Sequence, residues 1–213
     1  MMNKQIANRL LQPWKGMVLL LLGAIALFLS PFRVWLESSM TSHILIEFPL
    51  LVAVGYIFGL MISNRLPKFI TAMNAGGIAG ILLCTFCLSF WMIPRWLDES
   101  LLSSTVAMAK YASLILLVGL PLALSWDRMH SITRGVVKIE FLSMLFRLGW
   151  LYLISPERFC NNYLLGDQAL LGQGMLVLGL TLSLTWLIPL FIDQRETNAK
   201  YDNLREIKHS SLP

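Results

Sequence analysis

Met40, His43 and Glu47 are the residues whose types and spacing most suggest chemistry. They stand three and four positions apart, and on a helix this spacing puts all three on one face. A thioether and an imidazole together suit copper, so Met40 and His43 are candidate metal ligands, with Glu47 placed to tune the imidazole or to carry a proton. The structural alternative is that Met40 packs in an interface, His43 bonds a neighbouring loop and Glu47 pairs with a cation.

Glu47 also belongs to a set of charged residues that lie inside apolar segments, together with Lys110 and Arg147. A charge at the centre of a bilayer costs a few kcal/mol, so such residues are normally paired or functional. At 1.5 Å of rise per residue, each lies about 9 to 12 Å below the outer end of its predicted helix. The shared depth predicts a buried polar cluster of these three residues. The cluster would either stabilise the packing of the helices or form part of a proton, metal or substrate path.

The three cysteines, Cys84, Cys87 and Cys160, are too few for a disulfide framework. Cys84 and Cys87 form a C-x-x-C pair inside an apolar segment. They could add soft metal ligands, but small residues in a packed helix are the simpler explanation.

The composition places this chemistry in a membrane. Of 213 residues, 56% are hydrophobic and 14% are charged, and the mean hydropathy is +0.67. These values exclude a soluble enzyme, a nucleic-acid-binding protein and a small secreted protein stabilised by disulfides. We therefore interpret the net charge of +5 as an indication of which loops face the cytoplasm, and not as a sign of nucleic-acid binding.

The apolar runs predict an all-α, polytopic transmembrane bundle, because about 20 apolar residues cross a bilayer as a helix. Residues 1–192 would form a single transmembrane domain, and residues 193–213 a polar tail. Lys138, Glu140 and Arg147 interrupt the fifth span, for which a helix lying on the membrane surface is the competing interpretation. The six predicted spans are Gly16–Leu36, Ser42–Ile62, Phe69–Ile93, Ser103–Trp126, Val136–Ser155 and Ala169–Ile192.

The basic residues orient this bundle. Twelve Lys or Arg residues fall in the segments on one side, including both termini, against Arg33, Arg95 and Arg158 on the other. Cytoplasmic segments carry the excess of Lys and Arg, so both termini and the polar tail are predicted to be cytoplasmic.

Small residues and prolines predict how the helices pack. Gly55 and Gly59 in the second span, and Ala72, Gly76 and Gly80 in the third, form small-x-x-x-small patterns that let backbones approach closely. Pro49, Pro121 and Pro189 should kink the second, fourth and sixth helices.

The chemically varied loop residues fall on the outer side, where loops held by a rigid scaffold often carry function. A contact surface for a partner or a cofactor edge is one interpretation of these loops, and satisfaction of caps and turns is the other. The candidate rim residues are Pro94, Trp96, Asp98, Arg158, Cys160, Asn162, Tyr163, Asp167 and Gln168.

The chain resembles the CtaG-like cytochrome c oxidase assembly family of bacterial membrane proteins over roughly residues 16–126. The resemblance implies a helical bundle of the bacterial inner membrane that assists copper delivery to a haem-copper oxidase. His43 matches the first of two outward-facing histidine positions of the family, but Met108 and Lys110 stand at the second, without a histidine. The matching residues are Ser30-Pro31, Met40-Thr41-Ser42-His43, Pro49-Leu50-Leu51, Gly55, Phe90-Trp91-Met92-Ile93-Pro94 and Leu97-Asp98.

The sequence therefore predicts a non-enzymatic accessory protein of oxidase biogenesis, with copper handled at the outer face. A respiratory oxidase or another membrane redox protein, together with membrane lipid, would be its partner. Two alternatives stay open: a stable structural subunit of a membrane redox complex, and a small transporter that uses the intramembrane charges.

Overall fold

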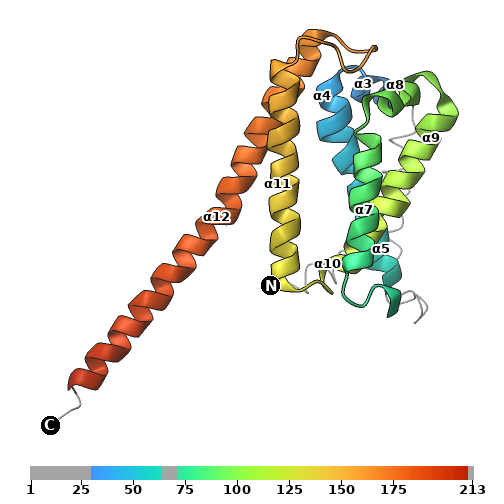
Figure 1. The fold of residues 1–213 in the computed structure, drawn as a ribbon. Helices are drawn as coiled ribbons and strands as arrows, with labels where there is room; N and C mark the ends of the chain where they lie inside the picture. The colour runs from blue at the N-terminus through green and yellow to red at the C-terminus, as the bar shows by residue number, and fades with distance from the viewer. Residues whose placement is uncertain (1–29, 64–71, 211–213) are drawn as a thin grey trace.

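The computed structural model describes residues 30–63 and 72–210, and every regular element in these ranges is helical (Figure 1). In chain order they are α3 (Ser30–Leu36), α4 (Met40–Ser42), η1 (His43–Glu47), α5 (Phe48–Ile62), α7 (Ile78–Trp91), α8 (Pro94–Leu102), α9 (Ser104–Ser113), η3 (Leu114–Gly119), α10 (Leu120–Trp126), α11 (Ser131–Ile154) and α12 (Leu165–Ser210).

The prediction of an all-α chain with helices able to cross a membrane is confirmed. Three helices in the described ranges are long and apolar enough: Met40–Ile62, Ser104–Trp126 and Leu165–Ile188. A fourth is added if α7 and α8, which meet at a bend of 71°, form one broken span. The first predicted span, Gly16–Leu36, lies outside the described residues except for α3.

Two of the three helices expected to be kinked by proline contain a π-helical segment, whereas α12 runs from Leu165 to Ser210 without a break at Pro189. η1 ends two residues before Pro49, and η3 ends two residues before Pro121. Proline removes one i→i−4 hydrogen bond, and its ring crowds the carbonyl four residues earlier. A widened π turn is one way to absorb that conflict without ending the helix. Each span therefore remains continuous through its proline.

Glycines bring α5 against η3 and α10 at backbone distance. A Cβ added to Gly55 would collide with the carbonyl of Ile115, and one added to Gly119 would collide with the carbonyl of Val52. Gly59 faces the α10 backbone in the same way, with the Leu120 carbonyl 2.9 Å from its added Cβ. The small-residue face predicted for the second span is therefore a packing face.

The third predicted span is shorter than expected, because α7 begins only at Ile78. Gly77 has a φ of +70°, which breaks the helix before this point. The Asn74 carboxamide accepts from the Gly80 backbone N–H at 3.1 Å and donates to Ser125 at 2.9 Å, so it caps α7 and ties it to α10. The prediction that Ala72, Gly76 and Gly80 share a helix face is wrong for the first two.

The last two long helices pack on each other through a reciprocal glycine contact. The Gly172 carbonyl lies 3.0 Å from a Cβ added to Gly149, and the Gly149 carbonyl lies 2.8 Å from one added to Gly172. α12 then continues to Ser210, well past the end of its partner (Figure 1). Residues 193–210 of the predicted polar tail are therefore helical.

Three segments gather at one end of the bundle, drawn uppermost in Figure 1: α3 with its following turn, α8, and the loop at residues 155–164. Hydrogen bonds join the loop to both of the others. Asn161 donates to Asp98 of α8 at 2.7 Å, and Tyr163 donates to the Glu37 carbonyl at 3.0 Å. The three connectors predicted to share one side of the membrane thus meet in space.

Gly55→Ala should lower the melting temperature, because the added methyl group meets backbone atoms that cannot rotate away. Overpacking of this kind costs about 1–3 kcal/mol. The control is Gly135→Ala, also inside a helix, where no atom lies within 4 Å of the added Cβ. Thermal unfolding in detergent, followed by tryptophan fluorescence, should show a loss of several degrees for Gly55→Ala and none for the control.

Candidate functional site: a buried lysine among two carboxylates and a histidine

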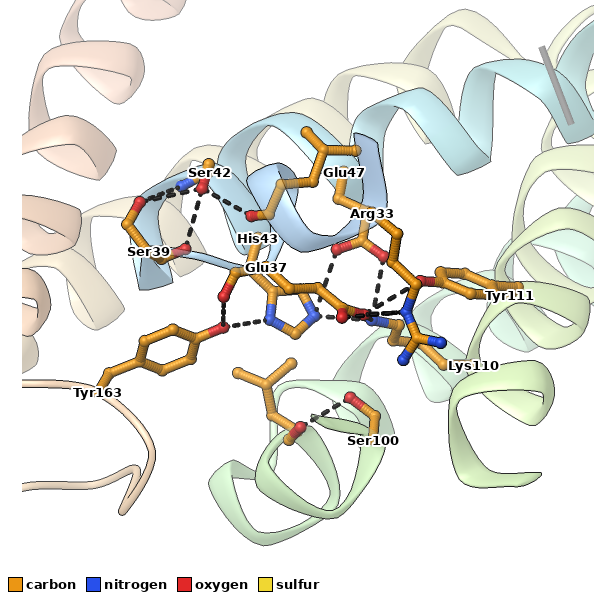
Figure 2. Close-up of polar contacts among 12 residues, drawn as sticks. Arg33, Glu37, Ser39, Ser42, His43, Glu47, Ser100, Lys110, Tyr111 and Tyr163 are labelled. Carbon is orange, nitrogen blue, oxygen red and sulfur yellow. Dashed lines mark hydrogen bonds and ion pairs between the residues drawn. The ribbon is translucent and has the colours of Figure 1, made fainter. Parts of the chain in front are cut away.

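The side chain of Lys110 is the centre of the site. Its Nζ lies 2.7 Å from His43 Nε2, 3.0 Å from Glu47 Oε1 and 3.4 Å from Glu37 Oε1 (Figure 2). Lys110 and His43 are 0% exposed and Glu47 is 1% exposed. A buried ammonium is therefore enclosed by one imidazole nitrogen and two carboxylates.

Three separate elements supply these groups. Lys110 belongs to α9, and Glu37 lies in the turn between α3 and α4. His43 and Glu47 come from the ends of η1, where their spacing of four residues places His43 Nε2 3.5 Å from Glu47 Oε2. The site therefore forms only when the start of the Met40–Ile62 helix packs against α9.

The hydrogen bonds of His43 fix its tautomer. An ammonium can only donate, so Lys110 donates to Nε2, and the ring proton is on Nδ1. Nδ1 then donates to the hydroxyl of Tyr163 at 2.7 Å, and this hydroxyl donates to the Glu37 carbonyl at 3.0 Å. The result is a directional chain of three hydrogen bonds from Lys110 to the backbone of Glu37. Both nitrogens of His43 are used.

The charges of the site balance. Arg33 binds the Glu37 carboxylate through Nε at 3.0 Å, and Tyr111 donates to the same carboxylate at 3.1 Å. Two cations, Arg33 and Lys110, thus face two carboxylates. Breaking a buried ion pair by removing one partner costs about 3–5 kcal/mol, because the other charge is left uncompensated.

Glu47 is the least satisfied member of the site. Neither of its carboxylate oxygens accepts a well-oriented hydrogen bond, although the Lys110 ammonium lies within ion-pair distance of one of them. A fully buried carboxylate normally accepts several hydrogen bonds. This carboxylate therefore depends mainly on electrostatic attraction to the ammonium.

Three residues form a possible metal-ligand group. Glu37, His43 and Glu47 each offer one ligand atom, and these atoms lie within 4.8 Å of one another. The other predicted ligand, Met40, lies in the apolar core beside Leu36 and Ile44. Cys84 and Cys87 face the Ser104–Trp126 helix, where the Cys84 thiol donates to the Val118 carbonyl of η3 at 3.2 Å and the Cys87 thiol to the Ser113 carbonyl of α9 at 3.9 Å.

The predicted charge cluster is assembled in part. The structure brings Glu47 and Lys110 together, but the place predicted for Arg147 is wrong. Arg147 is exposed on α11, where it binds Glu140 of the same helix at 2.6 Å. Counting residues from a helix end gives the height of a side chain along the axis, but not the direction in which packing turns it.

Glu37 and Arg33 are the site residues that sequence reasoning missed, because both were assigned to a connector. Their spacing of four residues and opposite charges, immediately before the Met40–His43 segment, were the available signal. Tyr163 was predicted as part of the rim, whereas the structure uses its hydroxyl to hold His43.

Most of the predicted rim is internally bonded. Asp98 accepts from Asn161 and Asn162 of the loop, and Gln168 accepts from the Phe159 backbone at 3.0 Å. Asp167 accepts from the Leu164 backbone at 3.4 Å. These contacts match the cap-and-turn interpretation of the loop.

Of the remaining rim residues, some are buried and others are exposed. Pro94 begins α8, and Trp96 is half-exposed against Phe90. Arg158 is exposed. Cys160 is a free, buried thiol, and burial together with the Asp98 carboxylate raises its pKa to about 12. It is therefore protonated at neutral pH and a poor nucleophile.

Comparison with known proteins identifies no relative. No family model matches the chain, and no curated protein and no solved structure is similar to it.

Tyr163→Phe should destabilise the protein, because it leaves His43 Nδ1–H without its acceptor and the Glu37 carbonyl without its donor. An unsatisfied buried polar group costs about 1–3 kcal/mol. Tyr152→Phe is the matched control, since this buried tyrosine makes no hydroxyl hydrogen bond among the described residues. Equal melting temperatures for the two variants would contradict the assigned hydrogen-bond chain.

Proposed function

We propose that this chain is a non-enzymatic, multi-pass membrane protein that acts as an accessory or assembly subunit of a membrane redox complex. The observation that carries the proposal is the Glu140–Arg147 ion pair on α11. The two side chains are 63% and 66% exposed, on a helix that also exposes Val136, Ile139 and Trp150.

In this proposal α11 crosses the membrane. It has 24 residues, which span about 36 Å at 1.5 Å per residue, enough for a bilayer core. It also packs along α12, whose Leu165–Ile188 part is apolar enough to cross. With α11 and the segment Gly16–Leu36, the proposed topology is six spans with both termini in the cytoplasm.

An ion pair on such a helix needs protein around it. Intramembrane charges cost a few kcal/mol each against lipid, and they almost always face a bundle interior or a water-filled cavity. Here α12 covers one side of α11, and Glu140 and Arg147 remain exposed. A partner helix that carries a polar side chain at this depth would remove the pair from lipid and complete its hydrogen bonds.

The class of partner comes from the resemblance to the CtaG-like family. It directs the proposal to a haem-copper oxidase or a related redox complex in a bacterial inner membrane. Co-purification at fixed stoichiometry would mark a stable subunit, and transient association an assembly factor. The transporter alternative has less support, because the charged groups of the site bind one another.

The partner role is tested by a photo-crosslinking benzoylphenylalanine placed at Trp150, one helical turn from Arg147 on α11. The matched control is Phe86 of α7, a 75% exposed aromatic position without neighbouring charges. We expect a crosslink from Trp150 to an integral membrane protein of a redox complex, and none from Phe86.

The crosslink should also depend on the ion pair. Glu140→Leu combined with Arg147→Leu makes this face apolar, so the protein should still insert and fold while the adduct is lost. Lipid adducts alone from Trp150, or an adduct that persists in the double variant, would contradict the proposal.

Copper handling at the outer face is the second candidate, favoured by the ligand group of Glu37, His43 and Glu47. These nitrogen and oxygen ligands suit Cu(II) better than Cu(I), and neither nitrogen of His43 is free. The site therefore does not fit copper unless its bonds rearrange.

Metal analysis after loading with Cu(I) or with Cu(II), with His43→Ala and Met40→Ala alongside the wild type, decides the copper role. We expect copper at background in all three proteins. Stoichiometric copper in the wild type that is lost in both variants would instead support copper handling.

A further inference from the structure

The Lys110 ammonium occupies the place where a metal ion would be bound. The possible ligand atoms of Glu37, His43 and Glu47 lie within 4.8 Å of one another, and all three surround Lys110 Nζ at 2.7 to 3.4 Å. These are the distances of hydrogen bonds and ion pairs. Zinc binds the same ligand types at about 2.0–2.2 Å, so the ligands would need to move inward by roughly 1 Å.

The ligand chemistry points to a divalent ion of the zinc type. One imidazole and two carboxylates leave a fourth tetrahedral position for water. The hydrogen bond from His43 Nδ1 to Tyr163 is the kind of outer contact that orients a metal-binding imidazole and leaves Nε2 as the ligand. The ring is therefore already oriented for a cation at Nε2.

Glu47 provides an independent indication. Its carboxylate is 1% exposed and accepts no well-oriented hydrogen bond, and the Lys110 ammonium and the Tyr111 hydroxyl are the donors that interact with it. Exchange of the ammonium for another cation would therefore cost this carboxylate little directional bonding.

We propose that Glu37, His43 and Glu47 form a latent divalent-metal site whose resident cation is the ammonium of Lys110. Lys110 thus acts as a tethered internal substitute for the metal. This inference does not depend on the proposed partner role.

The ammonium excludes a metal ion in the wild type for two reasons. A divalent ion beside the retained lysine charge would meet strong repulsion in a site of low dielectric constant. The lysine also has no easy exit, because its side chain is 0% exposed and lies against the ring of Tyr111, with Nζ 4.9 Å from the ring centre. The tether keeps the local concentration of the competing cation high.

The test removes the resident cation. Lys110→Met leaves two carboxylates facing only Arg33, so the metal-free variant should be destabilised and zinc should restore its melting temperature. Lys110→His is the second variant, because an imidazolium keeps the charge of the metal-free site and can become a fourth ligand. Each is purified without metal, titrated with zinc alone, and measured by metal analysis and thermal unfolding.

A matched control separates ligand binding from charge balance. In Lys110→Met combined with Glu47→Gln, one cation and one carboxylate remain, so the site is balanced but lacks a ligand. We expect one equivalent of zinc in each single variant, with an affinity at least tenfold above the wild type. The double variant and the wild type should retain zinc at background.

Four results would overturn the proposal. Stoichiometric zinc at this site in the wild type would mean that the ammonium does not exclude the metal. Zinc retained by the double variant would place the metal elsewhere. Folded single variants that bind no zinc, or single variants that fail to fold even with zinc present throughout, would mean that zinc cannot replace the ammonium.

Discussion

The burial of one positive charge constrains the end of the bundle where α3, α8 and the loop at residues 155–164 meet. Lys110 has no solvent contact, and a lone buried ammonium is far too costly to persist. Its compensation comes from His43, Glu47 and Glu37, which requires the turn after α3, η1 and α9 to converge. Tyr163 extends the requirement to the loop at residues 155–164. A single charge thus organises four segments from three distant parts of the chain.

Close backbone packing makes this convergence possible. Gly55 and Gly119 let the Met40–Ile62 helix approach η3 without intervening side chains. The π turns of η1 and η3 accommodate Pro49 and Pro121, so both helices continue across the bundle instead of breaking. The position of η1 before Pro49 also sets the orientation of His43 and Glu47. The same local distortion therefore serves packing and the site.

The α11–α12 pair differs in character from this core. Its contact is made by Gly149 and Gly172, while its charged residues, Glu140 and Arg147, stay exposed as an ion pair. Among the described residues, the charges around Lys110 are compensated inside the bundle, whereas the Glu140–Arg147 pair lies at the surface. The first accounts for the cohesion of the bundle, and the second is the basis of the proposed partner contact.

The sequence by itself determined the helical class, the apolar segments and two sites of helix distortion, at Pro49 and Pro121, because hydrophobicity, glycine spacing and proline act locally along the chain. It also predicted that Glu47 and Lys110 meet, since both are charges buried at similar depth. Only the tertiary structure decided the rest. The rotation of each helix sent Arg147 outward, Gly77 shortened α7, and the turn after α3 delivered Glu37. Rotation and loop path depend on contacts between distant segments, which local patterns do not contain.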